Sequence, residues 1–598
     1  MGDRSVFLAL AALGLACCAG PAAAGCTLAK IAELPVTMEG LAPIVPAKIN
    51  GVDARLVADS GAFFSMLGPA SVAKFGLSVG PPPFGLIVRG VNGDVSVGLA
   101  RAKEFTVLNN TFHNSDFLVG GSGISAGADG LLGGNLLDFA DVEYDLANGV
   151  IRLFKPQGCE GAALAYWSQG KPFSVLDIDR TSPTSRKINA SASVNGVRIR
   201  VELDTGSYRS MLTKGAARHA GIDPKGPGVI SAGLTGGLGR RPVSTWLAPV
   251  KSFKIGDEDV QNTRMRFGEI ELDSLDMLLG ADFFLSHRLY VANSQHKLYF
   301  TYNGGPVFNL DTAEDAPGGG PAPATSPAAA APAPASGAPG DYSDEPKDAD
   351  GFARRGAAFA ARMEYVRAIA DFTRAIELDP KESKRYYDRA HARFMAKQPA
   401  LAMADLDKAI ELKPDDAKAL EARASVRLSD KNIAGAQADF DAAARVDPPA
   451  RLAAALALTG SGAFEDAVAE WDQWIAALPK PYRLQEALNG RCWTRALWGK
   501  DLDKALADCD AALKLSPREA AFLDSRGLVH LRLGQLDASI ADYDEALRRN
   551  PKVAWSLYGR GLAKHRKGLQ AEGDADIRSA LVLAPRIEDE AKKYGLTP

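Results

Sequence analysis

Two patterns of hydrophobic and polar residues divide the chain of 598 residues into regions of different texture. Between about residues 27 and 303, short runs alternate apolar and polar residues and are separated by Gly-rich turns, as in INGVDARLVADSG at 49–61. Such alternation predicts half-buried β-strands, and the Asn-Gly pairs predict tight hairpins. Between 351 and 590, apolar residues recur at helical spacing among alanines and charges, which predicts amphipathic helices. We therefore expect a multidomain chain that is all-β first and all-α afterwards.

A low-complexity stretch separates these regions. All 25 residues from Ala316 to Gly340 are Ala, Pro, Gly, Ser or Thr, and seven of them are Pro. Such a segment cannot bury enough apolar area to offset the entropy of ordering its backbone. We therefore expect a Pro/Ala/Gly-rich disordered linker over residues 311–350.

The helical region repeats with a period of 34 residues. The sequence ADFTRAIELDP at 370–380 returns as ADLDKAIELKP at 404–414 and as ADYDEALRRNP at 541–551. Alanines, a larger apolar residue and a closing proline at this period resemble the tetratricopeptide repeat (TPR). The resemblance implies an all-α solenoid of about seven helix pairs over residues 351–590. It also implies a groove for a protein or peptide partner.

The β-rich region contains an internal duplication. Asn50-Gly51 is followed nine residues after the Asn by Asp59, and Asn195-Gly196 is followed at the same distance by Asp204. Each aspartate begins an Asp-Ser/Thr-Gly turn at the end of a predicted strand. Farther along each half comes a Leu-Leu-Gly sequence, ending at Gly133 and at Gly280.

These motifs resemble those of the retropepsin-like aspartic peptidases, in which two lobes each contribute one aspartate to a shared cleft. The resemblance implies a pepsin/retropepsin-like fold with lobes at 27–160 and 165–303, and Asp59 and Asp204 as the catalytic dyad. Two adjacent carboxyls cannot both ionise, so they share a proton and can activate water against a peptide bond. This chemistry needs no metal and no organic cofactor. The residues expected to support the active-site turns are Ser60, Gly61, Thr205 and Gly206.

Two Gly-rich segments are expected to close over the substrate or to be ordinary surface hairpins. They are 85–98, which contains a further Asn-Gly pair, and 231–241. The two resemblances together imply an exported aspartic endopeptidase whose substrate or regulator is recruited by the TPR region. One alternative is a catalytically inactive, peptidase-like scaffold in which both parts only bind proteins. Another is that each lobe pairs with its copy in a second chain, so that the dyad forms only in a dimer.

Charge and histidine spacing exclude other classes. Lys and Arg number 69 against 72 Asp and Glu, a net charge of −3, so no basic excess is available for nucleic acid. The seven histidines lack the spacing of a metal site. His287 and His296 are expected on strand surfaces.

The first 25 residues have the pattern of a secretory signal peptide. Arg4 precedes an apolar stretch from Val6 to Ala19, and alanines at 22–24 suit a cleavage site. Afterwards no apolar run reaches the roughly 18 residues that cross a bilayer. We expect a periplasmic or secreted bacterial protein. Lipidation at Cys26, which would attach it to a membrane, and an uncleaved anchor are the alternatives.

Cleavage after Ala24 would leave four cysteines, an even number that suits an oxidising compartment. Cys26 and Cys159 bracket one segment, while Cys492 and Cys509 lie on the two helices of one predicted pair. Two local disulfides are the simplest pairing, and four buried thiols are the alternative.

Overall fold

The computed structural model describes residues 26–597 apart from 83–85, 87, 91–92, 109, 122–126, 138, 180–186, 236–242, 273, 309–344, 479–482 and 552. The chain divides into two compact units between Leu378 and Asp379. The predicted signal peptide and most of the predicted linker lie outside the described residues. Within the described ranges, no helix has the length and apolar character needed to cross a membrane.

Lobe 1 of the first unit is built on an eight-stranded sheet with the order β2-β3-β4-β11-β5-β10-β9-β6. Buried residues alternate along its hairpins, as the sequence pattern predicts. Beside the sheet lies the separate hairpin β7–β8. The elements are β2 (Thr37–Glu39), β3 (Ala42–Ile49), β4 (Val52–Ala58), β5 (Met66–Leu67), α1 (Ser71–Lys74), β6 (Val79–Gly80), β7 (Val88–Gly90), β8 (Gly93–Val95), β9 (Val97–Val107), β10 (Asn110–Gly120), β11 (Gly130–Leu132) and α2 (Gly134–Leu137).

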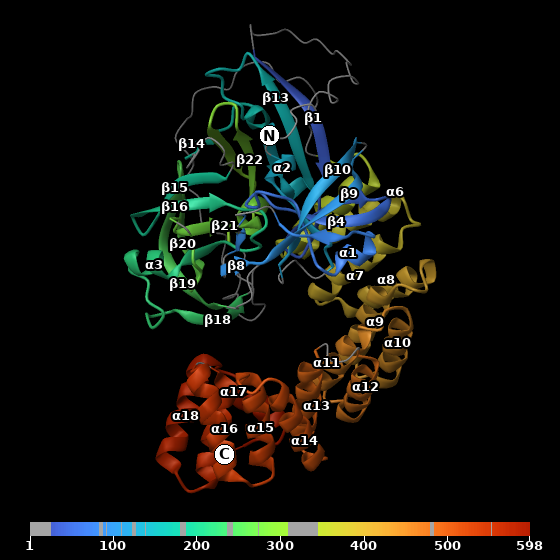
Figure 1. Ribbon diagram of the computed structural model, residues 1–598, viewed down its shortest axis with the longest axis vertical. Helices are drawn as coiled ribbons and strands as arrows, with labels where there is room; N and C mark the ends of the chain where they lie inside the picture. Colours follow the sequence, from blue (N-terminus) through green and yellow to red (C-terminus); the bar gives the residue numbers. More distant parts are fainter. Residues whose placement is uncertain are drawn as a thin grey trace. The chain divides into compact units, whose positions relative to one another are not determined.

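Lobe 2 repeats this arrangement in a seven-stranded sheet with the order β15-β16-β21-β17-β20-β19-β18. Figure 1 shows the two lobes, lobe 1 in blue and lobe 2 in green. The elements are β15 (Ile188–Val194), β16 (Val197–Leu203), β17 (Met211–Thr213), α3 (Lys214–His219), β18 (Ile230–Thr235), β19 (Val243–Ile255), β20 (Glu258–Gly268), β21 (Met277–Leu279) and α4 (Ala281–Ser286).

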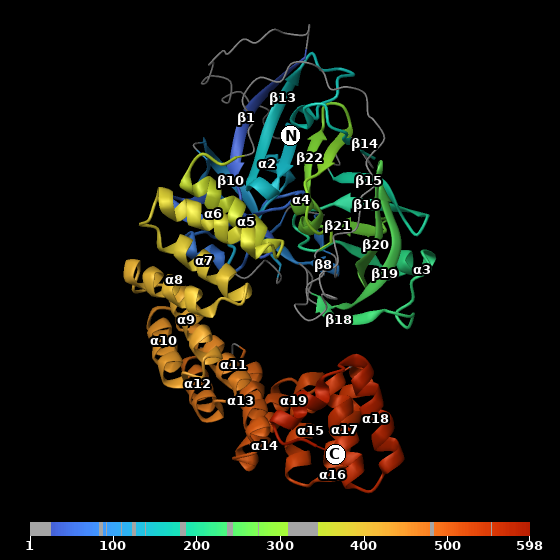
Figure 2. The ribbon, with the colours of Figure 1, turned by 180° about the vertical axis from the view of Figure 1, so that it is seen from behind.

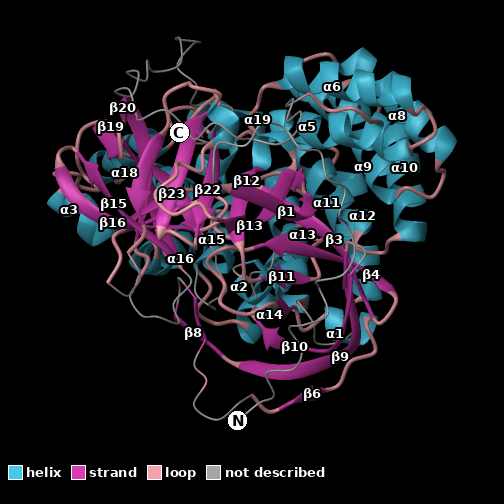
Figure 3. Cartoon of the chain, turned by 90° about the horizontal axis from the view of Figure 1, so that it is seen from above, coloured by secondary structure: helices cyan, strands magenta, loops and turns pink. Residues whose placement is uncertain are grey.

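A third, six-stranded sheet joins the lobes, with the order β1-β13-β12-β22-β23-β14. We call it the base sheet; its strands lie side by side in Figure 3. Its central contact is the antiparallel pair β12–β22, one strand from each half of the duplication. The two sequence halves are therefore paired within one chain. The strands are β1 (Thr27–Pro35), β12 (Asp141–Asp145), β13 (Val150–Gln157), β14 (Ser174–Asp177), β22 (His287–Ala292) and β23 (Lys297–Tyr302).

One helix pair, α5 (Ala349–Ala361) and α6 (Tyr365–Leu378), belongs to the same compact unit as the lobes. Helix α5 packs against β2 and against the short 3₁₀ helix η2 (Leu146–Asn148). Figure 2 shows the pair in yellow against the strands of this unit. The predicted range of helical repeats thus spans the division between the two units.

In the described part of the second unit, six further helix pairs are each packed as a hairpin, and a final helix, α19, follows them. An alanine near the C-terminal end of the second helix is buried in several repeats, for example Ala409, Ala443 and Ala512 at 0% exposed. These small side chains let the paired helices approach closely, and the predicted solenoid of helical repeats is confirmed. The helices are α7 (Ser383–Met395), α8 (Pro399–Leu412), α9 (Ala417–Ser429), α10 (Ile433–Val446), α11 (Ala450–Ser461), α12 (Phe464–Ala477), α13 (Leu484–Trp498), α14 (Leu502–Leu515), α15 (Ala520–Arg532), α16 (Leu536–Arg549), α17 (Ala554–Arg566), α18 (Gln570–Leu583) and α19 (Ile587–Lys593).

A ladder of ion pairs accompanies these hairpins. Arg423 of α9 binds Asp439 of its own hairpin through two nitrogens and Asp407 of the preceding one through a third, at 2.6–3.0 Å. The same bridging arrangement recurs at Arg526 and Arg560. Its signal in the sequence is the D-x-D motif with an arginine 16 residues before the first aspartate and 16 after the second. The predictions from sequence did not include it.

Candidate active site

The two predicted catalytic aspartates follow directly on equivalent strands. Strand β4 ends at Ala58 and β16 at Leu203, each in parallel pairing with the strand that carries the Leu-Leu-Gly sequence. That strand also holds the aspartate backbone. The amide of Asp59 donates to Leu132 at 2.9 Å, and the amide of Asp204 donates to Leu279 at 2.8 Å. The two turns therefore start from the same position of two equivalent sheets.

Reciprocal hydrogen bonds tie the two turns together. The amide of Ser60 donates to Oγ1 of Thr205, and the amide of Thr205 donates to Oγ of Ser60, both at 3.0 Å. Each hydroxyl then donates to a carbonyl of the opposite lobe, Ser60 to Leu203 at 3.1 Å and Thr205 to Ala58 at 2.8 Å. Ser60 and Thr205 are 3% and 0% exposed. Losing either hydroxyl would remove the side-chain partner of one amide and one carbonyl of the opposite lobe.

The two carboxyls face each other across these turns. Asp59 and Asp204 share a side-chain hydrogen bond. A Cβ atom placed on Gly61 would lie 2.5 Å from Cγ of Asp204, and one on Gly206 would lie 2.3 Å from Cγ of Asp59. Both turns thus need glycine, because each carboxyl occupies the space beside the glycine of the other lobe.

The environment of the pair favours a shared proton. Asp59 is 7% exposed. Burial raises its pKa well above the ordinary value, and the neighbouring charge of Asp204 and the hydrogen bond to it raise the pKa further. The amides of Gly61 and Ala62 donate to Oδ1 of Asp59 and act in the opposite direction. The pKa of Asp59 therefore depends on its neighbour in the other lobe.

A pair of polar side chains supports each turn from behind; Ser65, Ser210 and Asp282 are buried, whereas Asn135 is exposed. In lobe 1, Oγ of Ser65 accepts from the amide of Gly133 and bonds to Oδ1 of Asn135 at 2.9 Å. In lobe 2, Ser210 makes the same bond to the amide of Gly280 and donates to Oδ1 of Asp282 at 2.6 Å. These four side chains were not predicted from the sequence, although each stands at the same offset from its Asp-Ser/Thr-Gly or Leu-Leu-Gly motif.

The two predicted lids are described only in part. In the segment 85–98, β7 and β8 pair as a hairpin, and Leu86 and Val88 pack on the apolar cluster of lobe 1. Tyr208, which follows the second catalytic turn, packs on the same cluster. The tip of this hairpin lies outside the described residues. In the second segment, Ile230–Thr235 forms strand β18 against β19, and residues 236–241 lie outside the described residues.

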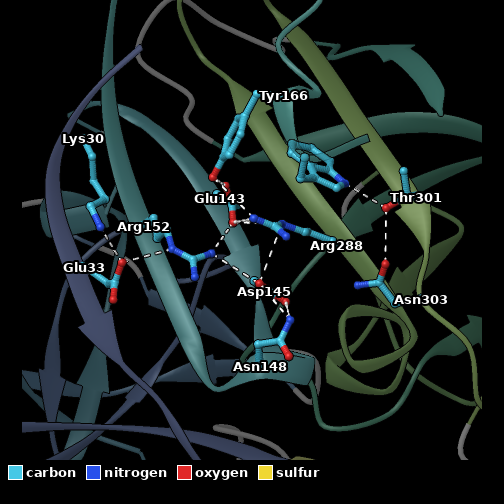
Figure 4. Close-up of polar contacts among 11 residues, drawn as sticks. Lys30, Glu33, Glu143, Asp145, Asn148, Arg152, Tyr166, Arg288, Thr301 and Asn303 are labelled. Carbon is cyan, nitrogen blue, oxygen red and sulfur yellow. Dashed lines mark hydrogen bonds and ion pairs between the residues drawn. The ribbon is translucent and has the colours of Figure 1, made fainter. Parts of the chain in front are cut away.

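The sequence analysis missed a buried ion network in the base sheet, shown in Figure 4. Glu143 and Asp145 of β12 are 0% exposed. Arg152 of β13 lies 2.5 Å from Glu143 and 3.3 Å from Asp145, and Arg288 of β22 lies 3.0 Å from Glu143. Burial and the Glu143 carboxylate raise the pKa of Tyr166, whose hydroxyl donates to Glu143. The network joins the two halves of the duplication within their shared sheet.

The cysteines and histidines are placed as follows. One disulfide joins Cys26 to Cys159 in the first unit, and another joins Cys492 to Cys509 in the α13–α14 hairpin.

His287 contradicts the prediction of a strand-surface residue. It is 0% exposed, lies 2.9 Å from the Glu258 carboxylate and stacks on a phenylalanine ring, because both faces of β22 are covered. No group of three or more His, Cys, Asp or Glu in the described ranges is arranged to hold a metal ion.

A cavity of about 670 Å³ occupies another part of the first unit. It lies between the base sheet and the α5–α6 pair, where Trp167, Tyr302 and Phe359 contribute rings and Arg355 and Arg362 contribute cations. Neither Asp59 nor Asp204 lines it. Its arginines are engaged within the chain, Arg355 with Asp371 and Arg362 with Glu364. The dyad and this cavity are therefore separate features.

Solved structures that resemble this chain contain helical repeats. A tetratricopeptide repeat protein from Parabacteroides merdae is 14% identical, with 42% of this chain and 99% of that chain covered and a TM-score of 0.34. The first TPR of Spaghetti (RPAP3) bound to an HSP90 peptide is 24% identical, with 20% and 94% covered and a TM-score of 0.19. Yeast Tom70 is 23% identical, with 40% and 50% covered and a TM-score of 0.28. Among curated proteins, no match is found.

Family models match both parts of the sequence. The model described as Aspartyl protease matches residues 45–136 and 190–283, once in each lobe. The model described as TPR repeat matches residues 527–568, within α15–α17. Each aspartyl protease match includes one Asp-Ser/Thr-Gly turn and one Leu-Leu-Gly strand. The chain therefore joins two tandem lobes, each of which matches the Aspartyl protease family model, to a region of tetratricopeptide repeats.

Proposed function

We propose that the first unit is an aspartic endopeptidase whose dyad is Asp59 and Asp204. The observation that carries the proposal is the facing pair of carboxyls, held by reciprocal Ser60–Thr205 hydrogen bonds at a site that raises the pKa of Asp59. A dyad with one proton contains a general acid and a general base within one hydrogen bond of each other. Pairing of the lobes within one chain makes a second copy of the chain unnecessary for this arrangement.

The proposed reaction is hydrolysis of a peptide bond. The ionised carboxyl accepts a proton from water as the water oxygen attacks the peptide carbonyl, while the protonated carboxyl donates a hydrogen bond to the carbonyl oxygen. The tetrahedral intermediate then releases the amine, which takes up a proton from the dyad, and the C–N bond breaks. The reaction requires the dyad to hold one proton, so activity should fall as the pH rises far enough to remove it.

Cleavage of a peptide library by the mature chain between pH 3 and 8 tests this proposal. Asp59→Asn and Asp204→Asn should each reduce kcat/KM by about 10³-fold or more, since each removes half of the shared acid–base pair. Asp53→Asn is the matched control, because Asp53 is a surface carboxyl of lobe 1 whose side chain is 86% exposed. Loss of activity in only one dyad variant would refute the shared dyad. An inert wild-type chain at every pH would favour the binding-scaffold alternative.

We further propose that the protein is exported to an oxidising compartment. All four cysteines that follow the expected leader are paired in disulfides. Mass spectrometry of the protein from its native cells would give its N-terminus. Export with simple cleavage predicts a chain that starts near Gly25 or Cys26 with both disulfides intact, whereas a lipid on Cys26 would identify the lipoprotein alternative. An intact Met1 with reduced cysteines would contradict export.

The TPR region is proposed to recruit the substrate or a regulator, since such repeats bind protein or peptide partners. Recruitment of a protein substrate adds binding energy away from the dyad. The substrate protein should therefore be cleaved with a lower KM than a short peptide that spans its own cleavage site, with a similar kcat. Equal KM values for protein and peptide would contradict recruitment of the substrate.

A further inference from the structure

The C-terminal end of the chain folds back onto the second unit. Helix α19 packs against α17 and α18 (Figure 2). After the helix, Gly595 has a left-handed backbone with φ +67°, and its amide donates to the carbonyl of Lys592 at 3.0 Å. The amide of Leu596 donates to the carbonyl of Ala591, also at 3.0 Å. This is the Schellman arrangement, in which a glycine ends a helix and turns the next residue back toward it. Leu596 is accordingly 1% exposed.

One side of this C-terminal segment, residues 587–597, is apolar and buried. Ile587, Ala591 and Leu596 are 0–1% exposed and belong to a hydrophobic cluster of the second unit. The charged residues between them, at 588–590 and 592–593, are exposed. Residues four apart lie on the same face of a helix. The segment is therefore a short amphipathic helix with its apolar side against the rest of the unit.

Tyr594, near the end of the segment, contacts helices of earlier pairs. The centroid of its ring lies 6.3 Å from that of Trp555 in α17 and 6.2 Å from that of Phe464, the first residue of α12. Trp555 in turn meets Trp493 of α13 edge to face at 6.1 Å. The guanidinium of Arg532, the last residue of α15, donates to the carbonyl of Tyr594. The end of the segment is therefore held by α12, α15 and α17, which are distant from it in the sequence.

A small pocket lies at the end of this segment. Leu596 forms part of its wall, and the rest comes from α16 and from α13, α15 and α17, the first helices of three successive pairs. Most of the wall is aliphatic or aromatic, including Trp493, Leu528 and Leu562. Repeat proteins bind their partners on the continuous surface that successive repeats share. The C-terminal segment is therefore seated on a surface of the kind that such repeats offer to a partner.

We propose that this pocket is a docking site for an amphipathic helix of a partner protein, and that residues 587–597 occupy the site in the free chain. The inference rests on the proposed recruiting role of the TPR region and adds the place and the chemistry of binding. A partner helix with the same spacing of apolar residues would make the contacts that the segment makes. It carries an aromatic residue two positions before an aliphatic one, as Tyr594 stands before Leu596. Such a partner has to displace the C-terminal segment, which lowers the fraction of the chain that is free to bind it.

A labelled peptide with the sequence of residues 585–598 tests the pocket by fluorescence anisotropy. It should bind a chain that ends at Ala584 about tenfold or more tighter than the wild-type chain, because the deletion frees the site. Leu596→Ala within the peptide should weaken binding about tenfold or more, since this side chain fills the pocket. Glu588→Ala within the peptide is the matched control, because Glu588 is exposed, and it should change the affinity less than about twofold. Equal affinities for the two substituted peptides would overturn the inference.

Two substitutions loosen the segment in the complete chain, so the test does not depend on how the shortened chain folds. Leu596→Ala removes the side chain from the pocket wall, and Gly595→Val disfavours the left-handed backbone that turns Leu596 inward. Each should tighten binding of the labelled peptide about tenfold relative to the wild type. Val582→Ala is the control, since Val582 of α18 is 81% exposed. Wild-type affinity in both loosened variants would overturn the inference.

Hydrogen–deuterium exchange shows where the peptide binds. Saturating peptide should speed the exchange of the α19 amides in the wild-type chain, because the segment leaves its site when the peptide enters. Unchanged exchange in α19 while the peptide is bound would place the peptide elsewhere and would overturn the inference.

Cleavage of a substrate protein separates this inference from the proposed recruiting role. If the pocket recruits the substrate, Leu596→Ala should lower the KM of the substrate protein about tenfold, because more of the chain is free to bind it. If the labelled peptide binds the loosened variants but the substrate protein and a short peptide have equal KM values, the pocket stands and recruitment of the substrate fails. If the substrate protein has the lower KM but the labelled peptide binds none of the variants, recruitment stands and the pocket inference fails.

Discussion

The two lobes of the first unit share the hydrogen bonds that shape their turns but differ in the side chains around them. Asn50 and Asn195 each donate from Nδ2 to a carbonyl 25 residues later, at 3.0 Å in both lobes. Asp129 and Asp276 each accept a backbone amide at 2.9 Å. In contrast, three side chains near the turns differ between the lobes. Phe64 of lobe 1 corresponds to Arg209 of lobe 2. Leu118 corresponds to Arg266, and Asn135 corresponds to Asp282. The hydrogen bonds between side chains and backbone are thus the same in both lobes, whereas the neighbouring side chains differ in charge and polarity.

Fusion of the lobes in one chain explains why such differences are possible. In a symmetric dimer every residue appears on both sides of the axis, so a cation on one side requires a cation on the other. A tandem chain is free of that constraint. The two halves of the base sheet also differ at equivalent positions. Glu143 of β12 pairs in register with Tyr290 of β22, and Arg288 of β22 supplies the charge opposite to Glu143. The tandem arrangement therefore permits different side chains on the two sides of the dyad.

Gly61 and Gly206, the glycines of the two Asp-Ser/Thr-Gly turns, test the part of the comparison in which the lobes are alike. Gly61→Ala and Gly206→Ala should each lower kcat/KM by about 10³-fold or more, because the added carbon would occupy the space of the opposite catalytic carboxyl. The effects should be similar in size, since each glycine faces the aspartate of the other lobe. Steady-state cleavage assays with a peptide substrate measure them.

Alanine at glycines away from the dyad provides the control. A Cβ on Gly80 of lobe 1 or on Gly215 of lobe 2 has its nearest neighbour at 3.8 or 3.9 Å, an ordinary contact. These variants should keep kcat/KM within about twofold of the wild type. Full activity in Gly61→Ala or Gly206→Ala would mean that the turns do not bring the carboxyls together in the active protein.

How far the sequence predicts this unit depends on whether a feature is local. The aspartates, the turn glycines and the Ser60 and Thr205 hydroxyls were predicted because each belongs to a short motif that occurs twice. The pairing of Met211 with Arg266 was not predicted, because the two residues are 55 residues apart and lie on β17 and β20, which pair only in the folded chain. The register of that pairing is a tertiary property, which a single sequence does not reveal.

The base sheet illustrates the same limit. The alternation Asp-Val-Glu-Tyr-Asp at 141–145 predicts a strand with one polar face, whereas all five residues are buried. Glu143 is buried because Arg288, 145 residues away, lies against it. His287 was misassigned for a related reason, since the second face of β22 is covered by elements that are distant in the sequence. Local patterns therefore identify strands. Which polar residues of a strand are buried depends on the elements that pack against its second face, and these are distant in the sequence.

The asymmetric ion network of the base sheet can be broken from either lobe. Glu143→Gln or Arg288→Met should lower the free energy of unfolding of the first unit by about 3–5 kcal/mol, because each removes one charge from a buried network and leaves the remaining charges unbalanced. The double variant should recover part of this loss. Hydrogen–deuterium exchange of the amides in β12 and β22 measures the change locally, although the chain has two compact units.

An exposed ion pair of the same lobe is the control for this network. Arg101 and Asp116 pair across β9 and β10 with 63% and 42% of their side chains exposed. Arg101→Met should change the opening free energy by less than about 1 kcal/mol. If Arg288→Met had an effect equally small, the network would contribute nothing to holding the two lobes together.

The smallest expected effect concerns the pH dependence of stability at the dyad. The pKa of Asp59 is raised in the folded chain by burial and by Asp204, so the folded state holds its proton more tightly than the unfolded state does. The folded state is therefore favoured most below the ordinary carboxyl pKa of about 4, and it loses this advantage as the pH rises through the raised pKa of the folded protein. Asp59→Asn cannot titrate, so it should stabilise the first unit at pH 7 relative to the wild type and do so less at pH 3. Exchange of the amides of β4 and β16 at both pH values measures the difference. Asp53→Asn, the surface control, should show no such change between the two pH values, and a stabilisation by Asp59→Asn that is larger at pH 3 than at pH 7 would contradict a raised pKa at the dyad.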